Sequence, residues 1–255
     1  MTRPKRPARR IAAAAGLALA MLAVTSGAAS AAAGTVTANK TLSATDIACN
    51  GSTDVTLTLQ GETGIAGNPV DIVLVLDRSG SMAGAPLANM KTGANAFVDV
   101  IDEATDGVLD GVVANGSRVG VVSFSDNATV NEPLTTNAGA LKADINALVA
   151  GGQTNHTAAI NTAEAQLAGS NPASEKVMII FTDGQSVPSS ANGLAAANAA
   201  KAAGTEIFAI GLGSVNVGQL NAWASDPDSE HVLIAPSSAD LQAIFEAIGA
   251  AIVVP

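Results

Sequence analysis

The sequence predicts an α/β fold, in which a doubly wound and mostly parallel sheet carries helices on both faces. From residue 69 onward, short apolar runs typical of strands alternate with longer Ala-rich or amphipathic stretches typical of helices. The run at residues 72–76 is unbroken and rich in β-branched side chains, which indicates a strand buried on both faces. Because the chain has no Tyr and a single Trp, we expect an aliphatic core.

The predicted elements of this main domain, residues 69–255, follow in chain order. Strands are expected at residues 71–76, 118–124, 176–181, 206–212 and 231–234. Helices are expected at residues 87–101, 138–149, 157–167, 191–203, 217–224 and 239–251. Residues 126–136 include Asn131-Glu132-Pro133, and Pro is confined to the edges of sheets, so this segment is expected to turn through an antiparallel edge strand.

Residues 1–33 have the pattern of a signal peptide. Five basic residues between positions 3 and 10 precede an apolar stretch at 11–24, and small residues follow, with Ala31 or Ala33 as the last residue before cleavage. The apolar stretch is short for a membrane anchor, which is the alternative. Arg9-Arg10 leaves the twin-arginine export route open beside the general one. We therefore expect an exported protein, secreted or at the cell surface, that is not inserted in a membrane after cleavage.

The charge balance excludes nucleic acid as a natural partner. The whole chain has 12 basic and 22 acidic residues, a net charge of −10. Five of the basic residues and none of the acidic ones lie in residues 1–33, so the remainder carries 7 basic against 22 acidic residues, a net charge of −15. Such a surface repels phosphate groups and anionic lipid, and it attracts divalent cations.

Residues 34–68 are expected to form a short N-terminal β segment. Alternating polar and apolar residues at 35–37 and 54–60 predict two half-exposed strands. Strands this few cannot form a stable domain alone, so they must pack on the main domain or pair with another chain segment. The strand-like end of the chain, residues 251–255, suggests that such a segment follows. Cys49 is the single cysteine, which leaves an intermolecular disulfide, a buried thiol and lipidation open.

Three oxygen-bearing side chains follow the strand at residues 71–76. Asp77, Ser79 and Ser81 stand at alternate positions, where the carboxyl end of a central strand meets a polar turn. Ligands of open α/β sheets bind at that edge. Carboxylate and hydroxyl oxygens are hard ligands, which suit Mg²⁺ better than zinc or copper. The alternative is a polar turn that caps the next helix.

Two further segments strengthen the cation hypothesis. Gly151-Gly152-Gln153-Thr154-Asn155 precedes a predicted helix, and Phe181-Thr182-Asp183-Gly184 follows another buried strand. With the Asp-x-Ser-x-Ser pattern, they resemble the metal-ion-dependent adhesion site of von Willebrand factor type A (vWA) domains and integrin I domains. The resemblance covers residues 69–252 and implies a Rossmann-like vWA fold. It implies a cation site, for Mg²⁺ or Mn²⁺, made by Asp77, Ser79, Ser81, Thr154 and Asp183.

The same resemblance implies a ligand and a source. Its integrin members accept an Asp or Glu carboxylate from a protein or extracellular-matrix partner at the cation. The loop at residues 226–231 is similar to that of bacterial secreted vWA proteins. Residues 82–85 replace the acidic pair that follows the motif in integrin β subunits, so we expect no adjacent calcium site.

Four residues beside the motif are candidates for the rim that contacts a ligand. They are Arg78, Asn155, His156 and Gly184. Arg78 has a surface position as its alternative reading, and so does His156. His231 is the only other histidine, so a zinc site is disfavoured.

The function predicted from these observations is an exported, divalent-cation-dependent, adhesion-type binding module. A structural subunit of a pilus or cell-surface assembly is the alternative, favoured by Cys49 and the incomplete β segment. A metal-assisted hydrolase is less consistent with the sequence, which lacks Gly-x-Ser-x-Gly, His-Glu-x-x-His and the phosphate-binding loop. Phosphoryl transfer through Asp77 also calls for a second carboxylate where Ser79 stands. We therefore predict that the chain is not an enzyme.

Overall fold

The computed structural model describes residues 36–42, 55–61 and 68–253 of the 255-residue chain. The predicted signal peptide and Cys49 lie outside the described residues. Within the described ranges, no helix has both the length and the apolar character that a membrane crossing requires.

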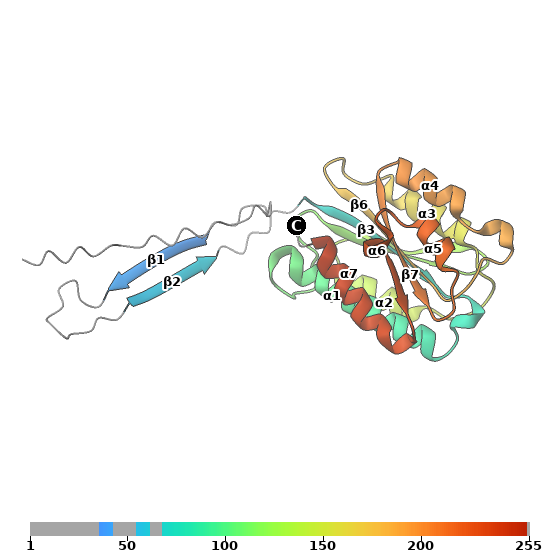
Figure 1. The fold of residues 1–255 in the computed structure, drawn as a ribbon, viewed down its shortest axis with the longest axis horizontal. Helices are drawn as coiled ribbons and strands as arrows, with labels where there is room; N and C mark the ends of the chain where they lie inside the picture. Colours follow the sequence, from blue (N-terminus) through green and yellow to red (C-terminus); the bar gives the residue numbers. More distant parts are fainter. Residues whose placement is uncertain (1–35, 43–54, 62–67, 254–255) are drawn as a thin grey trace, which may run out of the picture. The chain divides into compact units, whose positions relative to one another are not determined.

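The sheet within residues 68–253 has six strands (Figure 1). Its order is β5-β4-β3-β6-β7-β8, and every neighbouring pair is parallel except β4 and β5. The strands are β3 (Val70–Asp77), β4 (Arg118–Phe124), β5 (Ala128–Thr135), β6 (Glu175–Thr182), β7 (Thr205–Leu212) and β8 (Val232–Ala235). The predicted α/β fold and its antiparallel edge strand are confirmed.

Helices cover both faces of this sheet. They are α1 (Ala85–Asp106), α2 (Ala138–Ala147), α3 (His156–Leu167), α4 (Leu194–Ala202), α5 (Val217–Trp223), α6 (Asp228–His231) and α7 (Leu241–Val253). Helices α1, α2 and α7 pack on one face, and α3, α4 and α5 pack on the other (Figure 1).

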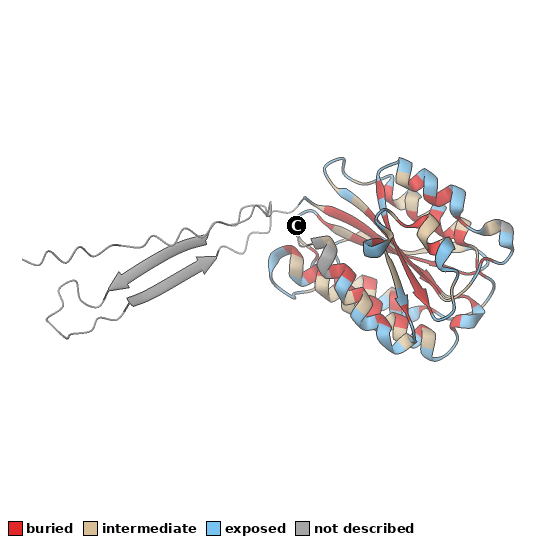
Figure 2. Ribbon diagram, viewed as in Figure 1, coloured by how far each residue is buried: buried red, intermediate tan, exposed pale blue. Residues whose placement is uncertain are grey.

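Strand β3 belongs to both cores because its side chains alternate between the two faces. Ile72, Leu74 and Leu76 join the cluster under α1, α2 and α7, whereas Val73 and Val75 join the cluster under α3, α4 and α5. Every residue of β3 is buried, and Figure 2 shows buried residues concentrated along the central strands. Each buried aliphatic side chain stabilises the fold by about 1.5–3 kcal/mol, so β3 anchors both layers.

Helices α1 and α7 approach closely at two glycines. A Cβ on Gly93 of α1 would lie 2.7 Å from the Phe245 ring and 3.1 Å from the Leu241 carbonyl oxygen. A Cβ on Gly249 of α7 would lie 2.9 Å from Val100 Cγ1. The absence of side chains at both positions therefore sets the distance between the two helices.

The end of the chain differs from its prediction. Residues 251–253 form the last turn of α7, where the sequence suggested a strand. Leu241, Phe245, Ile248 and Ile252 recur with the period of a helix and contact one core cluster. The short β-branched stretch therefore continues a helical stripe, and tertiary packing overrides its strand propensity.

Other boundaries shift by a few residues. Helix α4 begins at Leu194 instead of residue 191, because Gly193 adopts a left-handed φ of 75° and Asn192 Oδ1 accepts a hydrogen bond from the Leu194 N–H. Strand β8 begins at Val232, because His231 closes the short helix α6.

The N-terminal β segment contains the two predicted strands. β1 (Val36–Leu42) and β2 (Val55–Gly61) form an antiparallel pair, in which Val36 lies opposite Gly61 and Leu42 opposite Val55. Two strands alone are marginally stable in water. That this segment packs on the main domain or pairs with another segment stays a prediction.

Candidate metal centre

The candidate site lies where the direction of the sheet connections reverses. The chain passes from β3 outward to β4 and β5, and then returns to place β6 on the other side of β3. Loops at the carboxyl ends of two such strands diverge and leave a crevice, where ligands of open α/β sheets bind. Asp77 ends β3, and Asp183 directly follows β6.

Asp77 is fully buried and rigidly held. Its Oδ1 accepts a hydrogen bond from the Ser79 N–H at 2.8 Å, and its Oδ2 accepts one from Thr182 Oγ1 at 2.7 Å. Burial raises the pKa of Asp77 to about 6, although these hydrogen bonds to the carboxylate oppose the rise. Among the described residues no basic side chain forms an ion pair with it.

Ser79, Ser81 and Asp183 complete a hydrogen-bonded cluster. Ser81 Oγ donates to Asp183 Oδ1 at 2.8 Å, so Ser79 Oγ is the donor in the 3.1 Å contact between the two serine hydroxyls. Burial also raises the pKa of Asp183. A short 3₁₀ turn at Gly80–Met82 bends the chain so that both hydroxyls lie on one side.

Backbone hydrogen bonds place the loop of Thr154 beside this cluster. The Gly80 N–H donates to the Gly152 carbonyl at 3.0 Å, and the Gly151 N–H donates to the Arg78 carbonyl at 2.8 Å. The Thr154 carbonyl accepts from the Val187 N–H at 2.9 Å, which ties the loop to the segment after β6. Thr154 is buried, and its hydroxyl has no hydrogen-bond partner in the described part of the chain.

Asp126 shapes this loop, and the sequence reasoning did not assign it a role. Its Oδ1 accepts from the Gln153 N–H at 3.2 Å. A Cβ on Gly152, whose φ is 81°, would overlap Asp126 Oδ2, so only glycine leaves room for this carboxylate. A signal for it exists in the sequence, since Asp126 stands two residues after the end of strand β4, close to the carboxyl edge of the sheet where Asp183 directly follows β6.

Two residues of the predicted rim adjoin proposed cation ligands in the chain. Gly184 follows Asp183, and Asn155 follows Thr154. Gly184 is partly exposed and has open space where a Cβ would stand. Asn155 caps α3, because its Oδ1 accepts from the Ala158 N–H at 3.0 Å, while its Nδ2 donates to the Asp126 carbonyl.

Arg78 points elsewhere. Its guanidinium Nε donates to Ser123 Oγ on β4 at 3.3 Å, and the side chain lines a separate cleft that Leu148 and Val149 also border. The Arg78 side chain is half-buried. Within the described residues it forms no hydrogen bond with the hydroxyls of Ser79 and Ser81.

The prediction that His156 lies at the rim is wrong. Its side chain is fully buried, stacked in tilted contacts on Phe124 and Trp223 with ring centroids 5.3 and 4.6 Å away. As the first residue of α3, it faces the core below the crevice. Burial lowers its pKa to about 4, so the ring is neutral near pH 7.

His156 instead belongs to a buried hydrogen-bond chain that ends at Asp77. The hydroxyl of Thr182 donates its single hydrogen to Asp77. It must therefore be the acceptor in its 3.0 Å hydrogen bond with His156 Nε2. His156 Nδ1 then lacks a proton and accepts from Ser186 Oγ at 2.5 Å. The sequence does not predict this series of hydrogen bonds, because its residues come from three separate segments.

The donor set fits a hard divalent cation. The buried carboxylate of Asp77, the partly exposed carboxylate of Asp183, two clustered hydroxyls and the nearby Thr154 hydroxyl are all oxygen ligands. Within the described residues, no group of three or more His, Cys, Asp or Glu side chains gathers as a metal site. Neither carboxylate forms an ion pair with a basic side chain of the described residues, so their negative charge is available to a small cation of high charge.

The chain resembles matrilins of animals in sequence. It is 30% identical to matrilin-3 of Gallus gallus over 181 residues, which cover 67% of this chain and 37% of that protein. It is 32% identical to matrilin-1 of Bos taurus over 174 residues, which cover 64% and 30% of the two chains. The chain thus spans about a third of the length of the curated relatives it matches.

Three solved structures share the fold. Proximal thread matrix protein 1 of the mussel byssus, with a zinc-occupied MIDAS motif, is 26% identical, with a TM-score of 0.57 over 71% of this chain and 47% of that chain. The pilus adhesin SpaC from Lactobacillus rhamnosus GG is 19% identical, with a TM-score of 0.63 over 85% and 33%. A type V pili tip protein from Porphyromonas gingivalis is 17% identical, with a TM-score of 0.63 over 72% and 95%.

The family follows from a match over most of the chain. The profile of the von Willebrand factor type A domain matches residues 71–247, which include every strand and helix from α1 to α6 and most of β3 and α7. The chain belongs to the von Willebrand factor type A domain family.

Proposed function

We propose that this chain is an exported binding module that captures a carboxylate of a protein or matrix partner through a bound divalent cation. The observation that carries the proposal is the cluster of Asp77, Ser79, Ser81 and Asp183 in the crevice between β3 and β6. The relatives named as matrilins and as a pilus adhesin support a binding role for the domain.

In this proposal, five side chains hold the cation. They are Asp77, Ser79, Ser81, Thr154 and Asp183. The bound cation supplies a Lewis-acidic position for an Asp or Glu carboxylate of the partner. The three hydroxyl ligands are neutral, so they leave the positive charge incompletely balanced and available to that carboxylate.

The chain's other residues keep this arrangement rigid. Thr182 and the Ser79 N–H hold the Asp77 carboxylate in one orientation, and Asp126 fixes the backbone before Thr154. Side chains that are ordered before binding lose little conformational freedom when the partner arrives.

Mg²⁺ is the cation we propose, with Mn²⁺ as the close substitute. Both prefer oxygen ligands, whereas the nitrogen and sulfur ligands that zinc favours are missing among the side chains of the cluster. The mussel thread protein carries zinc at its motif, so a competition experiment between the cations is informative.

Export and cell-surface location are part of the proposal. The signal-peptide pattern at residues 1–33 and the net acidic charge support them. The assignment of this chain to the bacterial secreted type of vWA protein is supported by the loop at residues 226–231 alone. The matrilins that the chain resembles in sequence are animal proteins.

A structural role in a surface assembly is the second candidate. It is favoured by β1 and β2, which pair only with each other in the described residues. A two-stranded sheet gains stability when a further strand joins it, so a neighbouring subunit is a suitable partner for this segment. Cys49 remains a candidate for a disulfide to such a partner.

We propose no catalytic role. The buried chain from Ser186 to Asp77 contains a serine, a histidine and an aspartate, but Thr182 separates the histidine from the carboxylate. In a hydrolytic triad the carboxylate contacts the histidine directly and stabilises its protonated form. Within the described residues, the ring nitrogens of His156 contact only the hydroxyls of Ser186 and Thr182, and no carboxylate.

The test is affinity capture from extracellular-matrix and cell-surface extracts. The chain from residue 34 onward is immobilised with Mg²⁺, with EDTA, and as the Asp183→Ala variant with Mg²⁺. We expect a set of partners that is retained only in the first arm.

A charge-matched control separates the site from the overall charge. Glu103→Ala removes one negative charge from an exposed position on α1 and should retain the same partners as the unmodified protein. Recovery of identical partners by the Asp183→Ala variant would refute the cation-dependent mechanism. Assembly that survives both EDTA and Asp183→Ala would instead support the structural role.

A further inference from the structure

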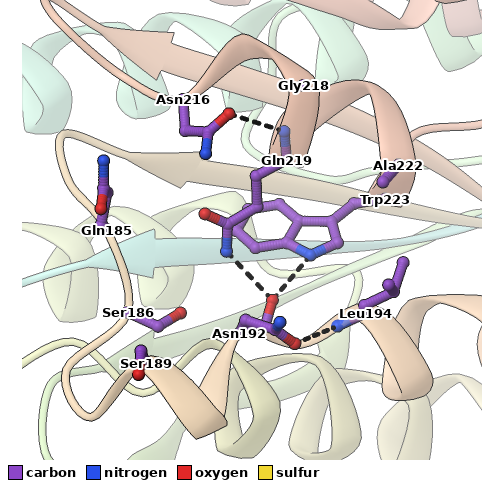
Figure 3. A pocket seen from close by; sticks show the side chains of 10 residues that line it. All are labelled: Gln185, Ser186, Ser189, Asn192, Leu194, Asn216, Gly218, Gln219, Ala222 and Trp223. Carbon is purple, nitrogen blue, oxygen red and sulfur yellow. Dashed lines mark hydrogen bonds between the residues drawn. The ribbon is translucent and has the colours of Figure 1, made fainter.

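A second cavity opens beside the candidate metal centre, on the β7 side of the same sheet edge. It has a volume of about 400 Å³ and lies between the loop after β6 and helix α5 (Figure 3). Sites for small molecules occupy roughly 300–1,000 Å³, so the cavity is large enough for a ligand. None of the five proposed cation ligands lines it.

The lining is polar but carries no charge. Amide and hydroxyl side chains make up most of it, namely Gln185, Ser186, Ser189, Asn192, Asn216 and Gln219. The chain has 22 acidic and 12 basic residues, yet none of them lines the cavity. A charged ligand would lose its hydration there without gaining an opposite charge, so the cavity suits a neutral ligand.

Several of these side chains offer hydrogen-bond donors. Asn192 and Asn216 each use the side-chain carbonyl oxygen to accept from a nearby backbone N–H, and neither side-chain NH₂ group has a hydrogen-bond partner among the described residues. Gln185 and Ser189 are exposed, and their side chains have no hydrogen-bond partner in the described part of the chain. Figure 3 shows these groups around one opening.

The same wall offers acceptors. The Gln219 side-chain NH₂ group donates to the backbone carbonyl of Asn192 at 3.1 Å, whereas the Gln219 side-chain oxygen has no hydrogen-bond partner among the described residues. The Ser186 hydroxyl donates its hydrogen to His156 Nδ1. That nitrogen is unprotonated, because the hydrogen bond to Thr182 places the ring proton on Nε2. Ser186 therefore presents only lone pairs to the cavity and recognises a group that donates.

An apolar base completes the cavity. Trp223 is buried at its floor, where the indole N–H donates to the Asn192 carbonyl at 2.8 Å (Figure 3). Trp223 has no exposed surface of its own, so the apolar surface that a ligand can contact comes from the exposed side chain of Leu194 and the partly exposed side chain of Ala222. A ligand that fits must therefore combine an apolar surface with several neutral polar groups.

We propose that this cavity binds a neutral saccharide. Each sugar hydroxyl both donates and accepts, which matches a wall where donors and acceptors are mixed. The C–H surface of a sugar ring matches the apolar base. A peptide main chain is the less suitable occupant, because it pairs with an exposed strand edge, and only loop and helix residues line this cavity.

The experiment uses the single tryptophan as its probe. Trp223 is the only Trp and the chain has no Tyr, so fluorescence emission and the indole N–H signal in an NMR spectrum both report on this cavity. Neutral monosaccharides, their methyl glycosides and short neutral oligosaccharides are titrated in EDTA. We expect a saturable change in both signals, with tighter binding of oligosaccharides if the natural ligand is a glycan and of free monosaccharides if it is a free sugar.

Two variants make the result specific. Gln185→Ala combined with Ser189→Ala removes two exposed side chains that form no hydrogen bond within the described residues, so we expect the fold to be preserved and binding to weaken about tenfold or more. Gln153→Ala removes an exposed glutamine outside the cavity and should leave binding unchanged. Because EDTA is present throughout, this result is independent of the cation-dependent function proposed above.

Three outcomes would overturn the proposal. The first is that no saccharide in the panel changes the Trp223 signals in a saturable way. The second is that the double variant binds as tightly as the unmodified protein. The third is that a blocked, uncharged peptide saturates the same signals while the saccharides do not.

Discussion

Thr182 is the residue on which the candidate site depends most, because of its buried hydroxyl group. It donates to Asp77 and accepts from His156, so one oxygen atom satisfies two buried polar groups. A buried donor or acceptor that loses its partner costs about 1–3 kcal/mol, and Thr182 serves two of them.

We expect Thr182→Val to lower the free energy of unfolding by about 2–4 kcal/mol, because the shape of the side chain is kept while both hydrogen bonds are lost. Thr182→Ser keeps the hydroxyl and should cost less than half as much. Urea unfolding in EDTA measures both. A Thr182→Val variant as stable as the Ser variant would show that the hydrogen-bond chain contributes little.

Asp77 and His156 affect stability in opposite directions as the pH changes. The native pKa of Asp77 is about 6, above its usual 3.8, so without a cation stability is lost as the pH rises through this window. The native pKa of His156 is about 4, below its usual 6.5, so stability is lost as the pH falls through that window. Each effect amounts to about 3 kcal/mol at 1.36 kcal/mol per pKa unit, and between pH 4 and 6 they nearly cancel.

The raised pKa of Asp77 predicts that protons compete with the cation. Below about pH 6, Asp77 binds a proton, so Mg²⁺ affinity should fall about tenfold for each further pH unit. The raised pKa of Asp183 acts in the same direction. Calorimetric titration of Mg²⁺ at about pH 7 and about pH 5 measures the difference, and equal affinities would contradict a site built on Asp77.

At the scale of elements, the contact between α1 and α7 is governed by glycine. Helix interiors disfavour glycine by about 1 kcal/mol relative to alanine, so its presence at positions 93 and 249 indicates a packing requirement. The short distances around these two glycines identify that requirement, since a Cβ at either position would enter the neighbouring helix.

Gly93→Ala should therefore destabilise the fold by about 1–3 kcal/mol, although alanine is the better helix former. Gly218→Ala in α5 is the matched control, because the nearest atom to its Cβ is Asn216 Oδ1 at 3.4 Å. That control should leave stability nearly unchanged. Thermal unfolding of the two variants measures the contrast, and a Gly93→Ala protein more stable than the parent would disprove the close contact.

For the whole molecule, cation binding should appear as stability. A ligand at a hundred times its dissociation constant stabilises the native state by about 2.7 kcal/mol. For a domain of this size that is a rise in Tm of roughly 5–10 °C. We expect saturating Mg²⁺ to produce such a rise, measured by thermal unfolding against EDTA.

The Asp183→Ala variant controls for general screening of the acidic surface. Its Tm should respond to Mg²⁺ no more than to an equal ionic strength of NaCl. If its Tm rises as much as that of the parent, the stabilisation comes from surface charge instead of the site.

The order of strands and helices could be predicted from local patterns, because each pattern directly reflects burial. The alternating apolar runs of residues 69–250 predicted the strands and the layers that the structure has, and Asn131-Glu132-Pro133 predicted the edge strand. The error at residues 251–253 arose because three apolar residues are too few to show whether the period is two or 3.6.

The candidate site divides in the same way. By itself, the sequence determined which oxygen-bearing residues follow the buried strands, and parallel strands necessarily bring those ends to one edge. Only the tertiary structure decided that His156 is buried, that Arg78 turns towards β4, and that Ser186, Thr182 and Asp77 are joined. Those outcomes depend on packing between segments that are distant in sequence. A single sequence carries no local signal of which side chains from such segments come into contact.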